Sequence, residues 1–358
     1  MVPAEVNTRP TNPTRRTVRK DIWTCGGIDH GLQARLAQTG GTTRTGAAVR
    51  RLSQHSRCSG RRNLRIVRGF PTRSERNRRR WGSERPSGVE TGGTAYGAPD
   101  AMRFYFIGTG SAFTLADDNF QSNAVLEADD GRRLLIDCGT DARRALKALG
   151  LGREDIHAIY ISHLHGDHVG GLEWFGFTSY FCPGSHRPEL FLAEDLVGPL
   201  WDNSLKAGMA ALDFGWARLE TFFKVHSLAT TGSFDFAGVR LDLVRLLHIR
   251  SGEAEMWSYG LMIHAPTGPV LFTSDCLHQP DVLMPWYRAA RLIFQDCDTG
   301  SRPGGAHAHY SHLCSLPAEI RARMWLYHVK DGPLPDAVAD GFLGFVRPGQ
   351  VFEFGAAA

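Results

Sequence analysis

Residues 161–172 read ISHLHGDHVGGL, and this stretch decides how the rest of the chain is interpreted. It begins at the end of the short apolar segment 158–162, which is typical of a buried strand. Four side chains able to bind a metal ion then fall within six residues: His163, His165, Asp167 and His168. Borderline divalent ions such as zinc favour imidazole and carboxylate ligands. The pattern therefore predicts a metal site at the end of a strand.

The spacing within this stretch indicates two ions rather than one. His163 and His165 occupy alternate positions of an extended turn, so their side chains point the same way, toward one ion. Asp167 and His168 lie further along the chain and can reach a second ion. Glycines within and just after this group allow the backbone to turn closely around the site: Gly166, Gly170 and Gly171.

Two further segments carry a resemblance to a known family. Residues 106–111 (FIGTGS) and residues 134–139 (LLIDCG), together with the histidine stretch, resemble the metallo-β-lactamase-fold superfamily of metallohydrolases. The first matches its opening glycine turn, and the second matches the strand whose aspartate, Asp137 here, supports the histidine loop. The likeness runs from about Met102 to Phe354 and is greater to the ribonuclease Z and cyclic-nucleotide phosphodiesterase branch than to the antibiotic-hydrolysing branch. It implies an α/β fold, a four-layer αββα sandwich.

The resemblance also implies where the remaining metal ligands lie. A third histidine should follow a strand, and His248 closes the apolar run 241–247, with His226 as the rival position. A bridging carboxylate should end a later strand, as Asp275 does, and a last histidine should follow the final core strand, as His328 does. The implied set places His163, His165 and His248 on one ion, Asp167, His168 and His328 on the other, and Asp275 between the two.

This ligand set implies two divalent ions as cofactors, with zinc favoured and manganese or iron as alternatives. Such a pair lowers the pKa of a bridging water and offsets the charge that develops on a phosphoryl oxygen. The expected activity is that of a metal-dependent hydrolase, a phosphodiesterase that uses a metal-bridging hydroxide on a small phosphodiester. In similar enzymes the residue at the position of Asp167 also orients the nucleophile, and a histidine before the last ligand strand donates a proton. His307 is the first candidate for that donor, and His309 is the second.

Other reactions on the same site stay open: hydrolysis of thioesters, lactones or β-lactams, and RNA cleavage of the ribonuclease Z type. Asp275 follows His248 by only 27 positions. That spacing is too short for the tRNA-gripping arm that similar bacterial ribonuclease Z enzymes carry there. A small molecule is therefore favoured over a nucleic acid as the partner, and a homodimer stays an open expectation.

The charge of the chain is divided unevenly along its length. Residues 1–100 hold 20 basic and seven acidic residues, whereas the remaining 258 residues hold 21 basic and 30 acidic ones. The first part also has few aliphatic residues, a composition typical of disorder. We therefore expect a disordered or dispensable Arg-rich extension over residues 1–101 and a hydrolase domain over residues 102–358. A targeting segment and a nucleic-acid-binding arm are the alternatives for the extension.

The cysteines and the hydropathy indicate the setting of the protein. The seven cysteines are scattered and form no CxxC pair, so neither a disulfide framework nor a zinc knuckle follows, and a reducing cytoplasmic location is expected. Cys276 stands beside Asp275, but strand neighbours point to opposite faces, so we expect it to be a buried packing residue. No apolar run approaches the roughly 18–20 residues of a membrane span, so no membrane partner is expected.

Overall fold

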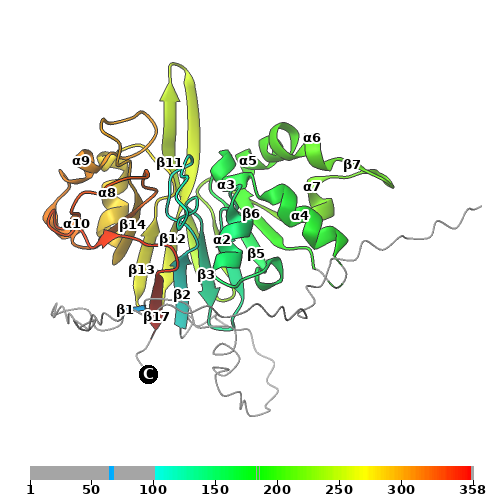
Figure 1. The fold of residues 1–358 in the computed structure, drawn as a ribbon, viewed down its shortest axis with the longest axis horizontal. Coiled ribbons are helices and arrows are strands. Elements are labelled where there is room, and N and C mark those ends of the chain that lie inside the picture. Colours follow the sequence, from blue (N-terminus) through cyan, green and yellow to red (C-terminus); the bar gives the residue numbers. More distant parts are fainter. Residues whose placement is uncertain (1–63, 68–100, 183, 185, 356–358) are drawn as a thin grey trace, which may run out of the picture. The chain divides into compact units, whose positions relative to one another are not determined.

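The computed structural model describes residues 64–67, 101–182, 184 and 186–355. Among these residues, two large β-sheets pack face to face and helices cover the outer face of each sheet (Figure 1). The four-layer αββα sandwich that the sequence predicts is confirmed. None of the described helices is long and apolar enough to cross a membrane.

The first sheet has eight strands in the order β1-β17-β2-β3-β4-β5-β6-β9. Strands β4, β5, β6 and β9 run parallel to one another, and the neighbours from β1 to β4 pair antiparallel. The strands are β1 (Leu64–Val67), β2 (Ala101–Phe106), β3 (Ala124–Ala128), β4 (Arg133–Ile136), β5 (Ala158–Ile161), β6 (Glu189–Ala193), β9 (Lys224–Leu228) and β17 (Val351–Gly355).

Strand β1 lies within the extension for which the sequence predicts disorder. It pairs antiparallel with β17, with Leu64 opposite Phe354 and Val67 opposite Val351. Three of its four residues are aliphatic, a composition that suits pairing with an open sheet edge, although the segment is too short to show a period. The structure therefore differs from the prediction at these four residues. Residues 1–63 and 68–100, the rest of the basic extension, lie outside the described residues.

The second sheet has seven strands in the order β10-β11-β12-β13-β14-β15-β16. The pairs from β10 to β13 are antiparallel, and those from β13 to β16 are parallel. The strands are β10 (Ser233–Phe236), β11 (Val239–Ser251), β12 (Ala254–Ala265), β13 (Gly268–Phe272), β14 (Leu292–Asp296), β15 (Met324–Tyr327) and β16 (Gly344–Phe345). The sequence predicts strands over residues 239–247 and 259–264. Strands β11 and β12 are longer, because their pairing continues to the turn at Gly252, whose φ is 59°. Figure 1 shows this hairpin projecting beyond the other strands.

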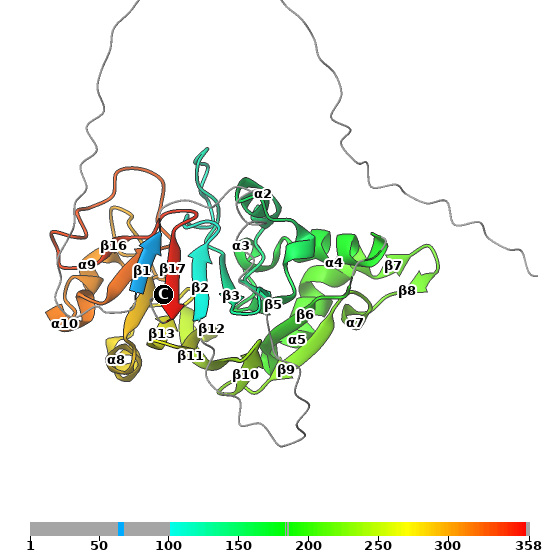
Figure 2. The same ribbon diagram turned by 90° about the horizontal axis from the view of Figure 1, so that it is seen from below.

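The helices form the two outer layers of the sandwich. Figure 2 shows α2 and α4 on one side of the paired sheets and α8, α9 and α10 on the other. The helices are α2 (Ala142–Ala148), α3 (Gly166–Val169), α4 (Leu172–Phe181), α5 (Glu194–Pro199), α6 (Lys206–Met209), α7 (Leu219–Phe222), α8 (Pro280–Ala289), α9 (Tyr310–Leu313) and α10 (Ala318–Arg321), with a short 3₁₀ helix η1 (Arg153–Asp155).

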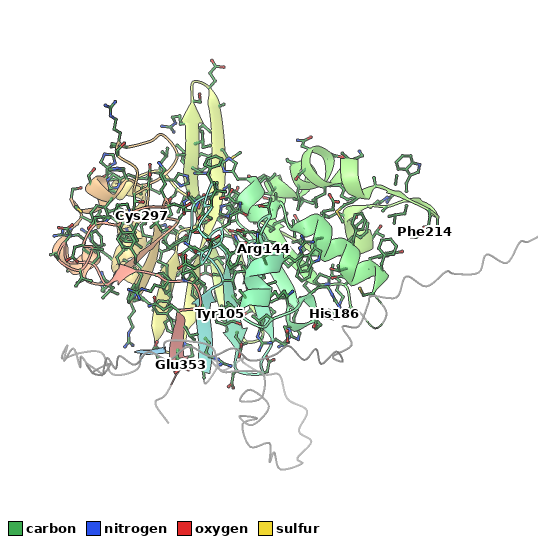
Figure 3. The ribbon with its side chains drawn as sticks, viewed as in Figure 1. Tyr105, Arg144, His186, Phe214, Cys297 and Glu353 are labelled. Atoms are coloured by element: carbon green, nitrogen blue, oxygen red, sulfur yellow. The ribbon has the colours of Figure 1, made fainter. Side chains whose placement is uncertain are left out.

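Helix spacing in the sequence favours a helix near residues 193–207, and the structure keeps the chain helical without a gap from Glu194 to Met209. Helix α5 passes into the π-helical segment η2 (Leu200–Leu205) and then into α6. Pro199 accounts for the change of hydrogen bonding, because it lacks the N–H that a regular α-helix needs. The short strands β7 (Ala211–Leu212) and β8 (Gly215–Trp216) follow, with Phe214 at their turn (Figure 3).

Apolar side chains fill the space between the layers. Between the sheets, the rings of Phe104 and Phe294 stack with centroids 5.1 Å apart. A second cluster packs the helices α2 and α4 onto the first sheet, and a third packs α8 and α10 onto the second sheet. Cys297, labelled in Figure 3, is fully buried in the third cluster. Because both faces of the central strands are covered, the sequence of these strands is almost continuously apolar.

Candidate metal centre

Several residues of the candidate metal centre follow the carboxyl ends of parallel strands. The supporting residue Asp137 follows β4, His163 lies just beyond β5, and His328 follows β15. Parallel strands end at the same edge of a sheet, which is where open α/β folds gather their functional side chains. Three non-glycine residues in these loops have positive φ: Asp137 (63°), Ser274 (53°) and His328 (64°). Such a backbone persists only where surrounding contacts hold it, as is common at functional sites.

The first group of candidate ligands consists of His163, His165 and His248. The Nε2 atoms of His163 and His248 lie 3.1 Å and 3.0 Å from the Nδ1 atom of His165. His248 sits at a β-bulge in β11, and such a bulge re-aims a side chain relative to the regular pleat. Its Nδ1 donates a hydrogen bond to the carbonyl oxygen of Ala306 at 2.7 Å. This bond fixes the ring and leaves Nε2 facing the other two histidines.

The second group consists of Asp167, His168, Asp275 and His328, all buried. The Nε2 atom of His168 lies 3.2 Å from a carboxylate oxygen of each aspartate. The Nε2 atom of His328 lies 3.3 Å from the same Oδ2 atom of Asp275. That oxygen is also 3.9 Å from Nε2 of two histidines of the first group. The carboxylate of Asp275 therefore lies between the two groups.

Asp137 supports the histidine loop through hydrogen bonds. Its carboxylate accepts hydrogen bonds from the backbone N–H and the hydroxyl of Ser162, both at 2.8 Å, and from Nδ1 of His168 at 2.7 Å. A carboxylate on Nδ1 fixes the tautomer and the orientation of a ligating histidine. Gly139 permits the close approach, because a Cβ atom there would lie 2.2 Å from the carbonyl oxygen of Asp167. The family resemblance implies this supporting role for Asp137, and the hydrogen bonds are consistent with the role.

The glycines of the histidine stretch do not all serve the close turn that the sequence predicts. A Cβ atom on Gly170 would lie 2.3 Å from Cγ2 of Thr140, and one on Gly171 would lie 2.4 Å from the carbonyl oxygen of Gly139. Gly166, in contrast, has nothing within 4 Å of such an atom. The close packing therefore comes from Gly170 and Gly171, whereas Gly166 lies in open space.

Several buried polar atoms of the second group have no hydrogen-bond partner. They are Oδ2 of Asp167, Nε2 of His168, Oδ1 of Asp275 and Nε2 of His328. An unpaired buried polar atom costs about 1–3 kcal/mol, so their convergence at one point calls for a further binding partner. Nitrogen and carboxylate oxygen donors in this arrangement fit divalent ions of the zinc type.

Burial shifts the pKa values of the histidines in the candidate metal centre. Burial, followed by the charge of His168, holds the pKa of His163 well below its usual range. Burial likewise lowers the pKa of His248 to about 4. These rings are therefore neutral at pH 7, the form in which imidazole binds a metal. Burial also lowers the pKa of His168, but Asp275, Asp137 and Asp167 outweigh it and raise that pKa well above its usual value. The carboxylates thus favour positive charge at this position.

Removal of metal ions should lower the thermal stability of the protein. We expect the melting temperature to fall by at least about 5 °C on dialysis against a chelator and to recover when Zn²⁺ is added back, because ions bound only by the folded state stabilise it. Differential scanning calorimetry measures this shift. The His226→Ala variant should keep the full shift and the His328→Ala variant should lose most of it. An equal response of both variants would contradict the assignment of His328.

The structure separates the two candidate proton donors. Nδ1 of His307 lies 3.0 Å from Oδ2 of Asp296 and 3.9 Å from Oδ2 of Asp275. Its ring centroid lies 4.5 Å from that of His328. His309 instead caps helix α9, where Nδ1 accepts from the N–H of Ser311 and Nε2 donates to a backbone carbonyl. Of the two, only His307 is brought to the candidate metal centre.

Asp296 is a site residue that the sequence reasoning missed. It is fully buried at the end of β14, and its Oδ1 atom lies 3.3 Å from Sγ of Cys276. Burial lowers the pKa of His307, but the hydrogen bond to Asp296 and the charge of Asp275 raise it to about 9. The sequence does contain a sign of this role: Asp296 stands at the end of an apolar strand, much as Asp275 follows one. Cys276 is fully buried, as predicted.

His226, the rival to His248, lies elsewhere. It belongs to the edge strand β9, its side chain is 44% exposed, and its ring stacks on Phe191 with centroids 4.5 Å apart. Within the candidate metal centre, His165 and His307 are the partly exposed histidines, whereas His163, His168, His248 and His328 are buried. A molecule in solution would therefore reach the centre past His165 and His307.

The solved structures of other proteins show the same fold at low sequence identity. The metallo-β-lactamase fold protein YhfI from Bacillus subtilis is 17% identical, with a TM-score of 0.54 over 71% of this chain and 100% of that chain. Yeast PDE1 is 11% identical, with a TM-score of 0.53 over 70% and 99%. The short form of human tRNase Z is 19% identical, with a TM-score of 0.50 over 70% and 98%. The metallo-β-lactamase fold predicted from the sequence is confirmed.

The sequence comparisons identify the family. Residues 102–352 match the family described as anti-Pycsar protein Apyc1. A curated anti-Pycsar protein Apyc1 from Saccharibacillus brassicae is 36% identical over 254 residues, 70% of this chain and 99% of the relative. Another, from Paenibacillus sp. (strain J14), is 36% identical over 255 residues, again 70% of this chain and 99% of the relative. A match of this extent shows that the chain belongs to the anti-Pycsar protein Apyc1 family.

Proposed function

We propose that this protein is a dinuclear metal-dependent phosphodiesterase that opens the phosphodiester of a cyclic nucleotide. The observation that carries the proposal is the pair of adjacent histidine and aspartate groups with the carboxylate of Asp275 between them. These groups and the fold support a metal-dependent hydrolase. The name of the relatives, anti-Pycsar protein, implies degradation of cyclic nucleotides, which narrows the proposal to that substrate class.

The ligand roles follow the two groups. His163, His165 and His248 would hold one ion, Asp167, His168 and His328 the other, and Asp275 would contact both. When bound, two divalent ions supply a water of lowered pKa as the nucleophile and offset negative charge on the phosphoryl oxygens. Zinc is the proposed metal, because the donor atoms are imidazole nitrogens and carboxylate oxygens.

The chain's own residues would orient and protonate the reacting groups. Asp167 would also orient the attacking water, since its buried carboxylate belongs to the second ligand group. His307 would donate a proton to the leaving alkoxide from Nε2, because Asp296 already occupies its Nδ1 atom. An alkoxide is a poor leaving group without that proton. Asp296 is then a positioning residue that keeps the ring of His307 beside the centre.

The connection between His248 and Asp275 favours a small substrate. It consists of the hairpin β11–β12 and strand β13, joined by short turns at residues 252–253 and 266–267. No additional arm extends from this described segment to hold a folded RNA. We accordingly assign the proposed catalysis to residues 102–358, with strand β1 adding to the sheet edge.

A substrate panel on the metal-loaded full-length chain tests the proposal. We expect hydrolysis of 3′,5′-cyclic nucleotides and of bis(p-nitrophenyl) phosphate, loss of both activities on chelation, and no comparable rate on thioesters, lactones or β-lactams. Product analysis by chromatography should show a linear nucleotide. Metal-loaded protein that is inactive on every phosphodiester but active on a thioester would refute the phosphodiesterase and leave a hydrolase of another class on the same site.

A further inference from the structure

Two large apolar side chains stand almost fully exposed on the loop between β2 and β3. Phe113 is 89% exposed and Leu115 is 90% exposed. Burying such side chains would gain about 1.5–3 kcal/mol each, so their exposure on a short loop indicates that a partner covers them. In Figure 1 this loop rises at the end of the sandwich where helix α3 carries the histidine stretch.

The loop is held in place rather than free to collapse onto the surface. The carboxylate of Asp331 accepts hydrogen bonds from the hydroxyl of Thr114 and, at 2.7 Å, from the backbone N–H of Leu115. The N–H of Thr114 donates to the carbonyl oxygen of Ser111 at 3.1 Å, which closes a turn under Phe113. The two apolar side chains are thus presented by a preorganised backbone, which lowers the entropy cost of binding a ligand to them.

Both ends of the loop are attached to the candidate metal centre. The N–H of Ser111 donates to the carbonyl oxygen of Val329 at 2.9 Å, and Val329 directly follows His328. At the other end, the side-chain amide of Asn123 donates to the carbonyl oxygen of Asp167 at 3.0 Å. Phe113 lies two residues from Ser111, a span of at most about 7 Å. Phe113 is therefore tied to the segment that carries His328 by two chain positions and one backbone hydrogen bond.

We propose that Phe113, assisted by Leu115, is the platform on which the planar base of the cyclic nucleotide stacks; this inference rests on the proposed function. An aromatic ring accepts any base, because every base has a π-face. The platform would contribute to substrate affinity and leave the chemical step to the metal centre. It would also make the enzyme selective for a nucleotide over phosphodiesters that lack a base.

The Phe113→Ala variant of the full-length chain tests this platform. We expect KM for a 3′,5′-cyclic nucleotide to rise at least about tenfold with kcat within about twofold. Hydrolysis of a ribose cyclic phosphate that lacks a base should not change, and Phe113→Trp should restore KM. The matched control is Trp216→Ala, an aromatic residue that is 86% exposed on β8, which should leave KM unchanged. The Asp331→Ala variant should raise KM less, and combining it with Phe113→Ala should add little.

The outcomes separate this platform from the proposed function. An unchanged KM in Phe113→Ala, or an equal loss on the base-free phosphate, overturns the platform while the phosphodiesterase stands. If Phe113→Ala dissociates a dimer and leaves KM unchanged, the platform is also overturned, because the loop then contacts a second copy of the chain rather than the substrate. Calorimetric binding of the same cyclic nucleotide is measured in parallel. If the wild type binds the nucleotide but hydrolyses no phosphodiester, and Phe113→Ala loses this binding, the platform is supported and the proposed enzyme is refuted. If the wild type does not bind the nucleotide, both proposals are overturned.

Discussion

Replacing Asp275 with alanine is expected to lower phosphodiester hydrolysis by about a thousandfold or more, the largest effect of any single change. Its Oδ2 atom lies within 3.9 Å of four histidine Nε2 atoms that belong to both candidate ligand groups. No other side chain is placed to contact both proposed ions among the described residues. Loss of this carboxylate should therefore remove the second ion as well as the activity. Metal content by plasma mass spectrometry and kcat/KM on a cyclic nucleotide measure the two losses.

The control for this change is Asp281→Ala, which removes an exposed carboxylate in the first turn of α8. It should leave the metal content, the melting temperature and kcat/KM unchanged. The Asp275→Ala variant should also lose most of the rise in melting temperature that Zn²⁺ gives the wild type. Two bound ions and full activity in Asp275→Ala would show that this carboxylate does not bridge.

The second largest effect is expected from His307→Ala, which should lower kcat on a cyclic nucleotide by about a hundredfold to ten-thousandfold. The proposed role is protonation of the leaving alkoxide, and p-nitrophenolate leaves without a proton. The loss should therefore shrink to less than about tenfold on bis(p-nitrophenyl) phosphate. Metal content should stay that of the wild type. The comparison of the two substrates tests the proton transfer itself.

The matched control is His309→Ala, two residues along the same loop. This side chain caps α9 and bonds Ser311 and Gly300, so its loss should cost about 1 kcal/mol of stability and leave both rates within about threefold. The Asp296→Asn variant should move the rates in the same direction as His307→Ala but less. An equal loss of activity on both substrates in His307→Ala would contradict a proton donor and favour a metal ligand.

Much of the fold could be predicted because its information is local. Each central strand is a short apolar run. Asp137 and His328 follow such runs directly and Asp275 follows one after two residues, so the strand and the functional residue are found together. The helix expected over residues 193–207 is present, but helix spacing does not show its π-helical middle segment, which depends on Pro199 and on packing. Strand β1 was missed because its four residues form a strand by pairing with the edge of β17, a partner that lies far away in the sequence.

The sequence by itself determined that a metal site lies in the histidine stretch, since four ligand candidates within six residues leave little room for another interpretation, and its resemblance to a known family implied the fold. Only the tertiary structure decided which of two histidines in similar sequence surroundings belongs to the metal centre. His248 and His226 both occur near strands, but a bulge brings the first to the centre while the edge of the sheet keeps the second outside. His307 and His309 are two residues apart, and Asp296, which comes from another strand, holds one of them. Such choices depend on groups that are distant in the chain, and neither spacing nor composition records where those groups meet in space.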